Sequence, residues 1–121
     1  DLDAGAGNFW SYVDARDVAD LVAAALADLL ADDPAVAPGT HEAVNCVAAD
    51  NALGRPLLDL LRESYGEIPT DCAVDESAIA EGDDRGVYAI EKAARLFGWT
   101  PSRSWRDAAD EAVAEPTLFE E

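Results

Sequence analysis

Apolar side chains recur at the spacing of an α-helix over one long stretch near the N-terminus. This stretch forms a continuous apolar stripe made of Val18, Leu21, Val22, Ala25, Leu26, Leu29 and Leu30. Asp14 stands where an N-cap residue belongs, and Asp17 places a second carboxylate in the first turn. An Asp-Asp-Pro sequence follows the last apolar position. The pattern therefore predicts a helix from Ala15 to Ala31.

Weaker patterns predict further helices in the second half of the chain. Pro56 suits the first turn of one helix, and Gly66 suits its C-terminal stop. Another is expected from Tyr88 to Phe97, ending at the glycine that follows. A last helix opens at Ser104, because the acidic residue Asp107 lies at capping-box spacing from it.

Short runs of β-branched and aromatic residues between these helices predict strands. We expect one strand at Phe9–Val13, another at Glu42–Val47 and an edge strand at Ala73–Val74. Strands so few cannot form an independent parallel sheet, so Glu42–Val47 needs partners that this sequence does not contain. The pattern as a whole predicts an α/β fold, mostly helical with two or three short strands.

Length, composition and charge exclude several classes of protein and partner. The 121 residues and 12.8 kDa allow one domain, and no apolar run reaches the length of about 20 residues that a membrane span needs. Acidic residues number 26 against 8 basic ones, giving a net charge of −18. Such a charge repels phosphate backbones and anionic lipid, so we expect neither nucleic acid nor membrane as a partner. Lys92 is the single lysine, and this arginine-biased, acidic, alanine-rich composition favours a halophilic cytoplasm.

Two further features bear on compartment and completeness. Cys46 and Cys72 are isolated, which predicts reduced thiols and a cytoplasmic location. The chain starts at Asp1 and contains no Met, so we interpret it as a piece of a longer protein. The strand without partners at Glu42–Val47 is an independent reason for the same interpretation.

Motifs that suggest catalysis lack their structural context. Tyr88 and Lys92 have the Tyr-x-x-x-Lys spacing of a catalytic pair, but no suitable strand and Ser/Thr precede them. The Gly5-Ala-Gly7 sequence has no preceding strand, and His41 has no metal-ligand partner at a suitable spacing. We therefore assign no catalytic, cofactor-binding or metal-binding residue in this chain.

Other residues are candidates for binding. Trp10, Ser11 and Tyr12 lie on a strand that leads into a capped helix, where they can line a pocket or simply pack. Arg55 can clamp a phosphate or a carboxylate bidentately, or remain an exposed surface arginine.

Three stretches occur in a characteristic order. Residues 9–19 run from an aromatic strand through Val-Asp into Asp-Val-Ala, residues 41–47 read His-Glu-Ala-Val-Asn-Cys-Val, and residues 90–101 include Lys-Ala-Ala-Arg-Leu-Phe-Gly-Trp-Thr-Pro. In this order they resemble the extended short-chain dehydrogenases, the NAD-dependent epimerase/dehydratase family. The likeness covers Asn8 to about Ala114, and the Trp-Ser-Tyr sequence at residues 10–12 also resembles that of uronate-dehydrogenase-like and haloarchaeal sugar-oxidoreductase members.

The resemblance implies that residues 1–121 are the C-terminal substrate-binding lobe of an extended Rossmann-type fold. The Rossmann half that binds NAD or NADP, and the catalytic Tyr-x-x-x-Lys, are missing. The expected function is that of a substrate-binding fragment of an epimerase, dehydratase or dehydrogenase acting on a sugar or nucleotide sugar, not catalytic alone. The full-length protein is expected to form a homodimer. The candidate substrate-binding residues are Trp10, Ser11, Tyr12, Asn45 and Arg55.

Two other interpretations stay open. One is a stand-alone acidic helical module that binds a protein partner and has no enzymatic activity. The other keeps the family but makes the parent a degenerate, non-catalytic member.

Overall fold

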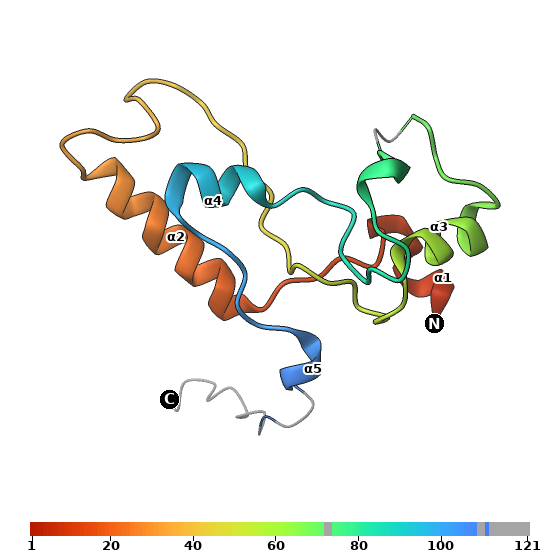
Figure 1. The fold of residues 1–121 in the computed structure, drawn as a ribbon. Coiled ribbons are helices and arrows are strands. Elements are labelled where there is room, and N and C mark those ends of the chain that lie inside the picture. The colour runs from red at the N-terminus through yellow and green to blue at the C-terminus, as the bar shows by residue number, and fades with distance from the viewer. Residues whose placement is uncertain (72–73, 109–110, 112–121) are drawn as a thin grey trace.

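The computed structural model describes residues 1–71, 74–108 and 111. Its elements, in chain order, are α1 (Leu2–Gly5), the 3-10 helix η1 (Ala6–Asn8), α2 (Ala15–Leu29), α3 (Leu57–Tyr65), the 3-10 helix η2 (Glu76–Ala78), α4 (Glu91–Phe97) and α5 (Trp105–Ala108) (Figure 1). These residues contain no β-strand, and an isolated antiparallel bridge joins Asp50 to Arg85. The predicted α/β fold, a Rossmann-type lobe with two or three short strands, is therefore wrong for the described chain. None of the helices in this part of the chain is long and apolar enough to cross a membrane.

Helix α2 confirms the main helix prediction but ends at Leu29, before Ala31. The Asp14 carboxylate accepts the Arg16 backbone N–H at 2.8 Å, which caps the first turn as expected. At the other end, the Asp28 carboxylate accepts the backbone N–H groups of the loop that follows the helix. These bonds turn the chain back before the helix can continue.

Helix α3 lies where it was predicted, directly after Pro56. Gly66 ends it with φ of 78°, a left-handed conformation that glycine adopts without the steric cost of a Cβ. The four leucines of this helix are all buried. Helix α3 is therefore the most deeply packed helix of the described chain.

The remaining two predicted helices, α4 and α5, are also present. Helix α4 begins at Glu91 rather than Tyr88, and Gly98 ends it with φ of 64°. Helix α5 begins after Ser104, whose backbone N–H donates to the Asp107 carboxylate at 3.1 Å as a capping box requires. Its expected inner face extends into Ala109, Ala112 and Val113, which lie outside the described residues.

The predicted strand Phe9–Val13 fails because its first two residues are not extended. Phe9 and Trp10 have φ of 54° and 56°, so the backbone turns there in the left-handed region. The Trp10 amide donates to the Gly5 carbonyl at 2.8 Å, and its indole N–H donates to the Leu2 carbonyl at 2.8 Å. Burial of the large indole against α1 and α3 stabilises this turn in place of a strand.

The predicted strand Glu42–Val47 keeps a strand-like alternation without a strand partner. Val44 and Cys46 are half-buried and pack inward, while Ala43 and Asn45 are exposed. No described segment pairs with this run along its length, so it does not form part of a sheet. The predicted edge strand is also wrong as far as it is described: Val74 is in no strand, and Ala73 lies outside the described residues.

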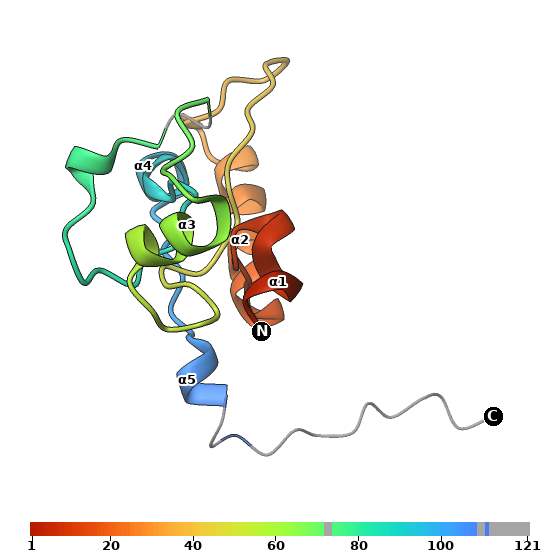
Figure 2. The same cartoon turned by 90° about the vertical axis from the view of Figure 1, so that its right-hand side faces the viewer.

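Two hydrophobic clusters hold the fold together. The first is centred on buried Trp10 and the α3 leucines, with α1 packed against it; the second joins Leu21 of α2, Ala93 of α4 and Trp99. In Figure 1, α1 and α3 of the first cluster lie at one end of the ribbon and α2 and α4 of the second lie at the other, connected by non-helical segments. Viewed from the α1–α3 end, α5 lies apart from the other helices (Figure 2).

Candidate functional site

A cluster of polar side chains forms where the non-helical segments meet α5. We call it the Asp50 cluster; its members are Tyr12, Asp50, Ser104 and Arg106. The Tyr12 hydroxyl donates to one oxygen of the Asp50 carboxylate. The other oxygen accepts from the Ser104 hydroxyl at 2.6 Å and from the Arg106 guanidinium. These side chains come from three segments far apart in the sequence.

Backbone contacts fix the cluster on the turn that begins α5. The Trp105 backbone N–H donates to the Tyr12 hydroxyl oxygen at 2.9 Å, and its indole N–H donates to the Asn51 carbonyl at 3.0 Å. Asn51 is fully buried, and its amide donates to the Asp84 carbonyl at 2.8 Å. The loops that carry Asp50 and Asp84 are thereby held beside each other.

The Asp50 cluster borders a surface pocket of about 360 Å³, the Asp50 pocket. Its lining residues are Ala49, Asp50, Asp84, Pro101, Ser102, Arg103, Ser104 and Arg106. Arg106 bridges the two carboxylates, since its second amino group donates to Asp84 at 2.6 Å. The pocket thus combines carboxylate acceptors, a hydroxyl and guanidinium donors.

The ionisation of Tyr12 limits its chemistry. Burial of the phenol and its hydrogen bond to the Asp50 carboxylate together raise the pKa of Tyr12. Tyr12 therefore stays protonated at neutral pH and serves as a hydrogen-bond donor to Asp50. In this arrangement it positions the carboxylate.

A buried carboxylate, that of Asp17, ties the segment before α5 to the first turn of α2. It accepts the backbone N–H groups of Ser102 and Arg103, each at 3.0 Å, and the Ser102 hydroxyl at 3.0 Å. The Arg103 guanidinium pairs with the same side chain, and the Trp99 indole N–H donates to the Asp17 carbonyl at 3.0 Å. Burial by itself raises the pKa of Asp17, but the donors from Arg103 and Ser102 outweigh burial and hold it below its usual value.

The candidate residues named from the sequence have separate surroundings. Trp10 is 2 % exposed and belongs to the core, and the buried Ser11 hydroxyl has no hydrogen-bond partner among the described residues. Both line a hollow of about 290 Å³ next to α1. Tyr12 belongs to the Asp50 cluster.

The other two candidates are exposed. The Asn45 amide donates to the Ala89 carbonyl at 2.9 Å. Arg55 pairs with Glu63, a hydrogen bond that raises the pKa of the guanidinium, so an anionic ligand there would have to displace Glu63. No described hydrogen bond joins one of the five candidates to another.

Sequence reasoning missed Asp17, Asp50 and Arg106 as organising residues. A signal was present in the charges: Arg103 and Arg106, two of the eight basic residues, stand within one turn of each other. In a chain this acidic, closely spaced arginines indicate a place where carboxylates converge. The sequence does not show which carboxylates converge there, because Asp17 and Asp50 reach this segment through contacts that span 85 and 54 positions of the chain.

Tyr88 and Lys92 do not lie on the same helix. Tyr88 lies before α4, and the Lys92 ammonium pairs with the Glu42 carboxylate at 2.7 Å. This ion pair joins α4 to the run that was predicted as a strand.

Comparison with known proteins adds no relative to this description: no family model, curated protein or solved structure matches the chain.

Proposed function

We propose that this chain is a substrate-binding part of an NAD(P)-dependent enzyme acting on a sugar or nucleotide sugar, and that the Asp50 pocket contacts that substrate. Hydride transfer and the binding of NAD or NADP belong to a part of the enzyme outside this chain. The proposal rests on the sequence resemblance together with one observation, the polar pocket bordered by the Asp50 cluster.

The composition of the Asp50 pocket suits a polyhydroxylated ligand. Sugar hydroxyls both donate and accept hydrogen bonds, so they match a wall that offers carboxylate oxygens beside hydroxyl and guanidinium donors. A volume of about 360 Å³ lies within the range of about 300–1,000 Å³ found for small-molecule pockets. Because three segments of the chain hold these groups, the wall is formed before a ligand arrives.

Contacts between the two ends of the region that resembles the dehydrogenase family support treating that region as one unit. Asp17 belongs to the first stretch, and its carboxylate binds Ser102 and Arg103, which follow the last stretch. Tyr12 of the first stretch also meets the beginning of α5.

Gly5 and Gly7 do not form the kind of glycine-rich turn that binds the phosphates of NAD. Gly5 ends α1, and a Cβ at this position would lie 2.5 Å from Cδ1 of Trp10, so glycine is required here for packing against the indole. Gly7 lies inside η1. Neither forms a glycine-rich turn between a strand and a helix, so we assign no cofactor contact to this chain.

Isothermal titration of the chain with UDP-glucose, glucose and glucuronate tests the proposal. We expect at least one to bind, and Ser104→Ala to weaken its binding about 3- to 10-fold through loss of a hydrogen bond. Ser77→Ala is the matched control, since this hydroxyl is exposed and donates to Asp75 away from the pocket. Absence of binding by all three ligands, or equal binding by the Ser104→Ala variant, would reject the Asp50 pocket as the site.

A second candidate function is a protein-interaction module without enzymatic activity. The observation that favours it is the row of exposed apolar side chains on α2, with Leu26 and Leu29 exposed by 55 % and 64 %. Such a module should be monodisperse and unfold cooperatively in 2 M KCl by itself. Aggregation of the isolated chain under these conditions would reject this candidate.

A further inference from the structure

The outward face of α2 is apolar along its whole length. Val18, Val22, Leu26 and Leu29 lie on it one turn apart and are 36 %, 53 %, 55 % and 64 % exposed. Leu21 lies at the edge of the same apolar stripe and packs against Ala93 of α4. The described residues leave this row only partly covered, although a helix normally buries its apolar stripe.

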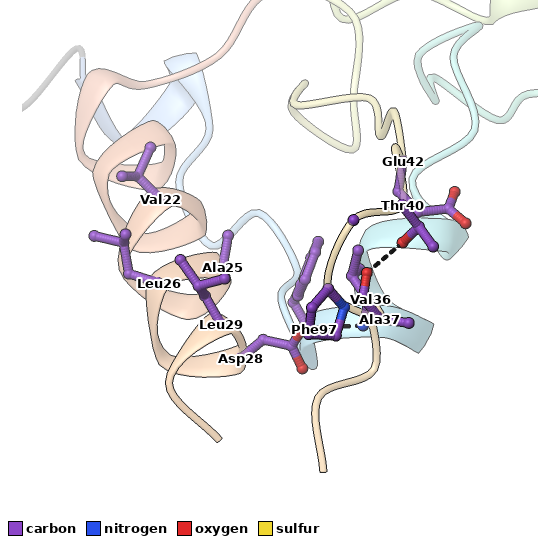
Figure 3. Close-up of a pocket in the computed structure, with 12 residues that line it drawn as sticks. Val22, Ala25, Leu26, Asp28, Leu29, Val36, Ala37, Thr40, Glu42 and Phe97 are labelled. Carbon is purple, nitrogen blue, oxygen red and sulfur yellow. Dashed lines mark hydrogen bonds between the residues drawn. The ribbon is translucent and has the colours of Figure 1, made fainter. Parts of the chain in front are cut away.

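Val22, Leu26 and Leu29 of this row form one wall of a groove of about 390 Å³, which we call the α2 groove. Its other wall consists of Val36 to Thr40 and the Phe97 ring (Figure 3). Figure 3 shows Val22, Leu26 and Leu29 on the helix and Phe97 with Thr40 across from them. The surface between the walls is made mainly of aliphatic and aromatic carbon.

Hydrogen bonds hold the second wall in place. The Asp28 carboxylate accepts the Ala35 backbone N–H at 2.7 Å and the Val36 backbone N–H at 3.1 Å. The Thr40 hydroxyl donates to the Ala37 carbonyl at 2.6 Å and closes the turn. The loop is therefore fixed to the end of α2, and the groove exists without an occupant to induce it.

The charges around the α2 groove select the occupant. Its charged lining residues are Asp28 and Glu42, both acidic, and Asp32 and Asp33 follow the end of the helix. Glu42 and Lys92 neutralise each other as an ion pair, so the negative charge of this rim comes from Asp28, Asp32 and Asp33. A second copy of the chain would bring another −18 charges to this face, whereas a basic segment would be attracted to it.

We propose that the α2 groove binds a basic amphipathic helix of a partner protein. Leucine-like side chains at i, i+3/i+4 and i+7 insert between α2 and Phe97, and flanking lysines or arginines face the acidic rim. This inference rests on the second candidate function. Its test measures peptide binding, so its outcome is independent of whether the Asp50 pocket binds a sugar.

The probe is a fluorescein-labelled 14-residue amphipathic peptide built only of leucine and lysine, titrated with the full chain in 0.15 M and 1 M KCl. Fluorescence anisotropy should report saturable 1:1 binding at both salt concentrations. The Leu26→Ser/Leu29→Ser double variant should bind at least 10-fold more weakly. Both side chains are more than half exposed, so we expect the urea midpoint of the variant to stay close to that of the original chain.

Leu30→Ser is the matched control, since Leu30 is 84 % exposed and does not line the groove. Its affinity should stay within 2-fold of the original chain. A peptide with glutamate in place of lysine should bind at least 10-fold more weakly than the lysine peptide in 0.15 M KCl.

Three results would overturn the proposal. If the double variant bound the peptide as tightly as the original chain, the peptide would be held by net charge alone and not by the α2 groove. A dimer of the chain in sedimentation that the double variant abolishes would assign the groove to a second copy. Tighter peptide binding after Leu118→Ser/Phe119→Ser would assign it to the end of the same chain.

Discussion

Replacement of Asp17 by Asn changes the charge of the most extensively bonded carboxylate with almost no change of shape. Its Oδ1 accepts from the Ser102 hydroxyl and the Arg103 guanidinium, and its Oδ2 accepts from the backbone N–H groups of the same two residues. An Asn amide has one oxygen, so its NH2 group takes the place of either Oδ2 or Oδ1. At the Oδ2 position it faces two backbone N–H donors and both bonds are lost; at the Oδ1 position the bond to the Arg103 guanidinium is lost and the Ser102 hydroxyl accepts in place of donating.

The cost follows from the burial of the side chain. Asp17 is 1 % exposed, whereas the Arg103 side chain is 31 % exposed and can regain water. A hydrogen bond to a charged group contributes about 1.5–3 kcal/mol and a neutral one about 0.5–1.5 kcal/mol. Loss of the charged bond to Arg103, or of the two backbone bonds, gives a decrease of about 2–3 kcal/mol in the free energy of unfolding. Urea unfolding followed by tryptophan fluorescence should show the midpoint fall by about 1–2 M.

Asp20→Asn is the matched control for this prediction. Asp20 lies one turn along α2, is 61 % exposed and contacts Arg103 at 3.2 Å. Its replacement should leave the urea midpoint unchanged, because an exposed ion pair contributes little to stability. A loss below about 0.5 kcal/mol in Asp17→Asn, or equal losses in both variants, would refute the assignment of Asp17 as the link between α2 and the segment before α5.

Three other predictions concern pH, backbone conformation and the core. The pKa of Asp17 is lower in the folded chain than in the unfolded chain, so the unfolded chain binds a proton there first and stability should fall as the pH drops below about 4. Urea midpoints measured between pH 6 and 3 should therefore fall less steeply for Asp17→Asn than for the original chain. Gly54→Ala should lower stability more than Gly66→Ala: both have positive φ, but a Cβ at Gly54 would lie 2.7 Å from Arg106 and one at Gly66 meets nothing within 4 Å. Thermal unfolding of the two variants measures the difference, and equal melting temperatures would contradict it. Leu61→Ala, at a fully buried position of α3, should cost about 2–5 kcal/mol in urea unfolding, and a cost under about 1 kcal/mol would mean that α3 is not the centre of the core.

Helices were predictable because their signals are local. Asp14 caps α2, Gly66 ends α3 and Gly98 ends α4, each through contacts within a few positions of the chain. The stripe on α2 was also located correctly, but only Leu21 of its members is buried in the described structure. Periodicity shows that a helix has an apolar face, and it does not show which neighbour covers that face.

Strands were predicted wrongly because their formation depends on a partner. The β-branched content of Glu42–Val47 marks an extended run, yet a strand requires a neighbour that the described chain does not supply. At Phe9 and Trp10 the backbone forms a left-handed turn, which burial of the Trp10 indole stabilises. Residue propensities do not predict this turn, because they do not include the contacts that bury the indole.

The candidate site was only partly predictable for a related reason. Tyr12 was named from the sequence, while Asp50 and Ser104 meet it through contacts across 38 and 92 positions. Such long-range contacts follow from the packing of whole elements. Their residue types alone, an acid and a serine, are too common in this chain to single out.

The intact mass and N-terminal sequence of the polypeptide isolated from its native source test the central proposal most directly. If the chain is a substrate-binding part of an NAD(P)-dependent enzyme, the mass should be well above 12.8 kDa, with a glycine-rich strand–helix unit near the start. A native polypeptide of 12.8 kDa beginning at Asp1 would contradict the enzyme proposal and leave the protein-interaction module as the function to pursue.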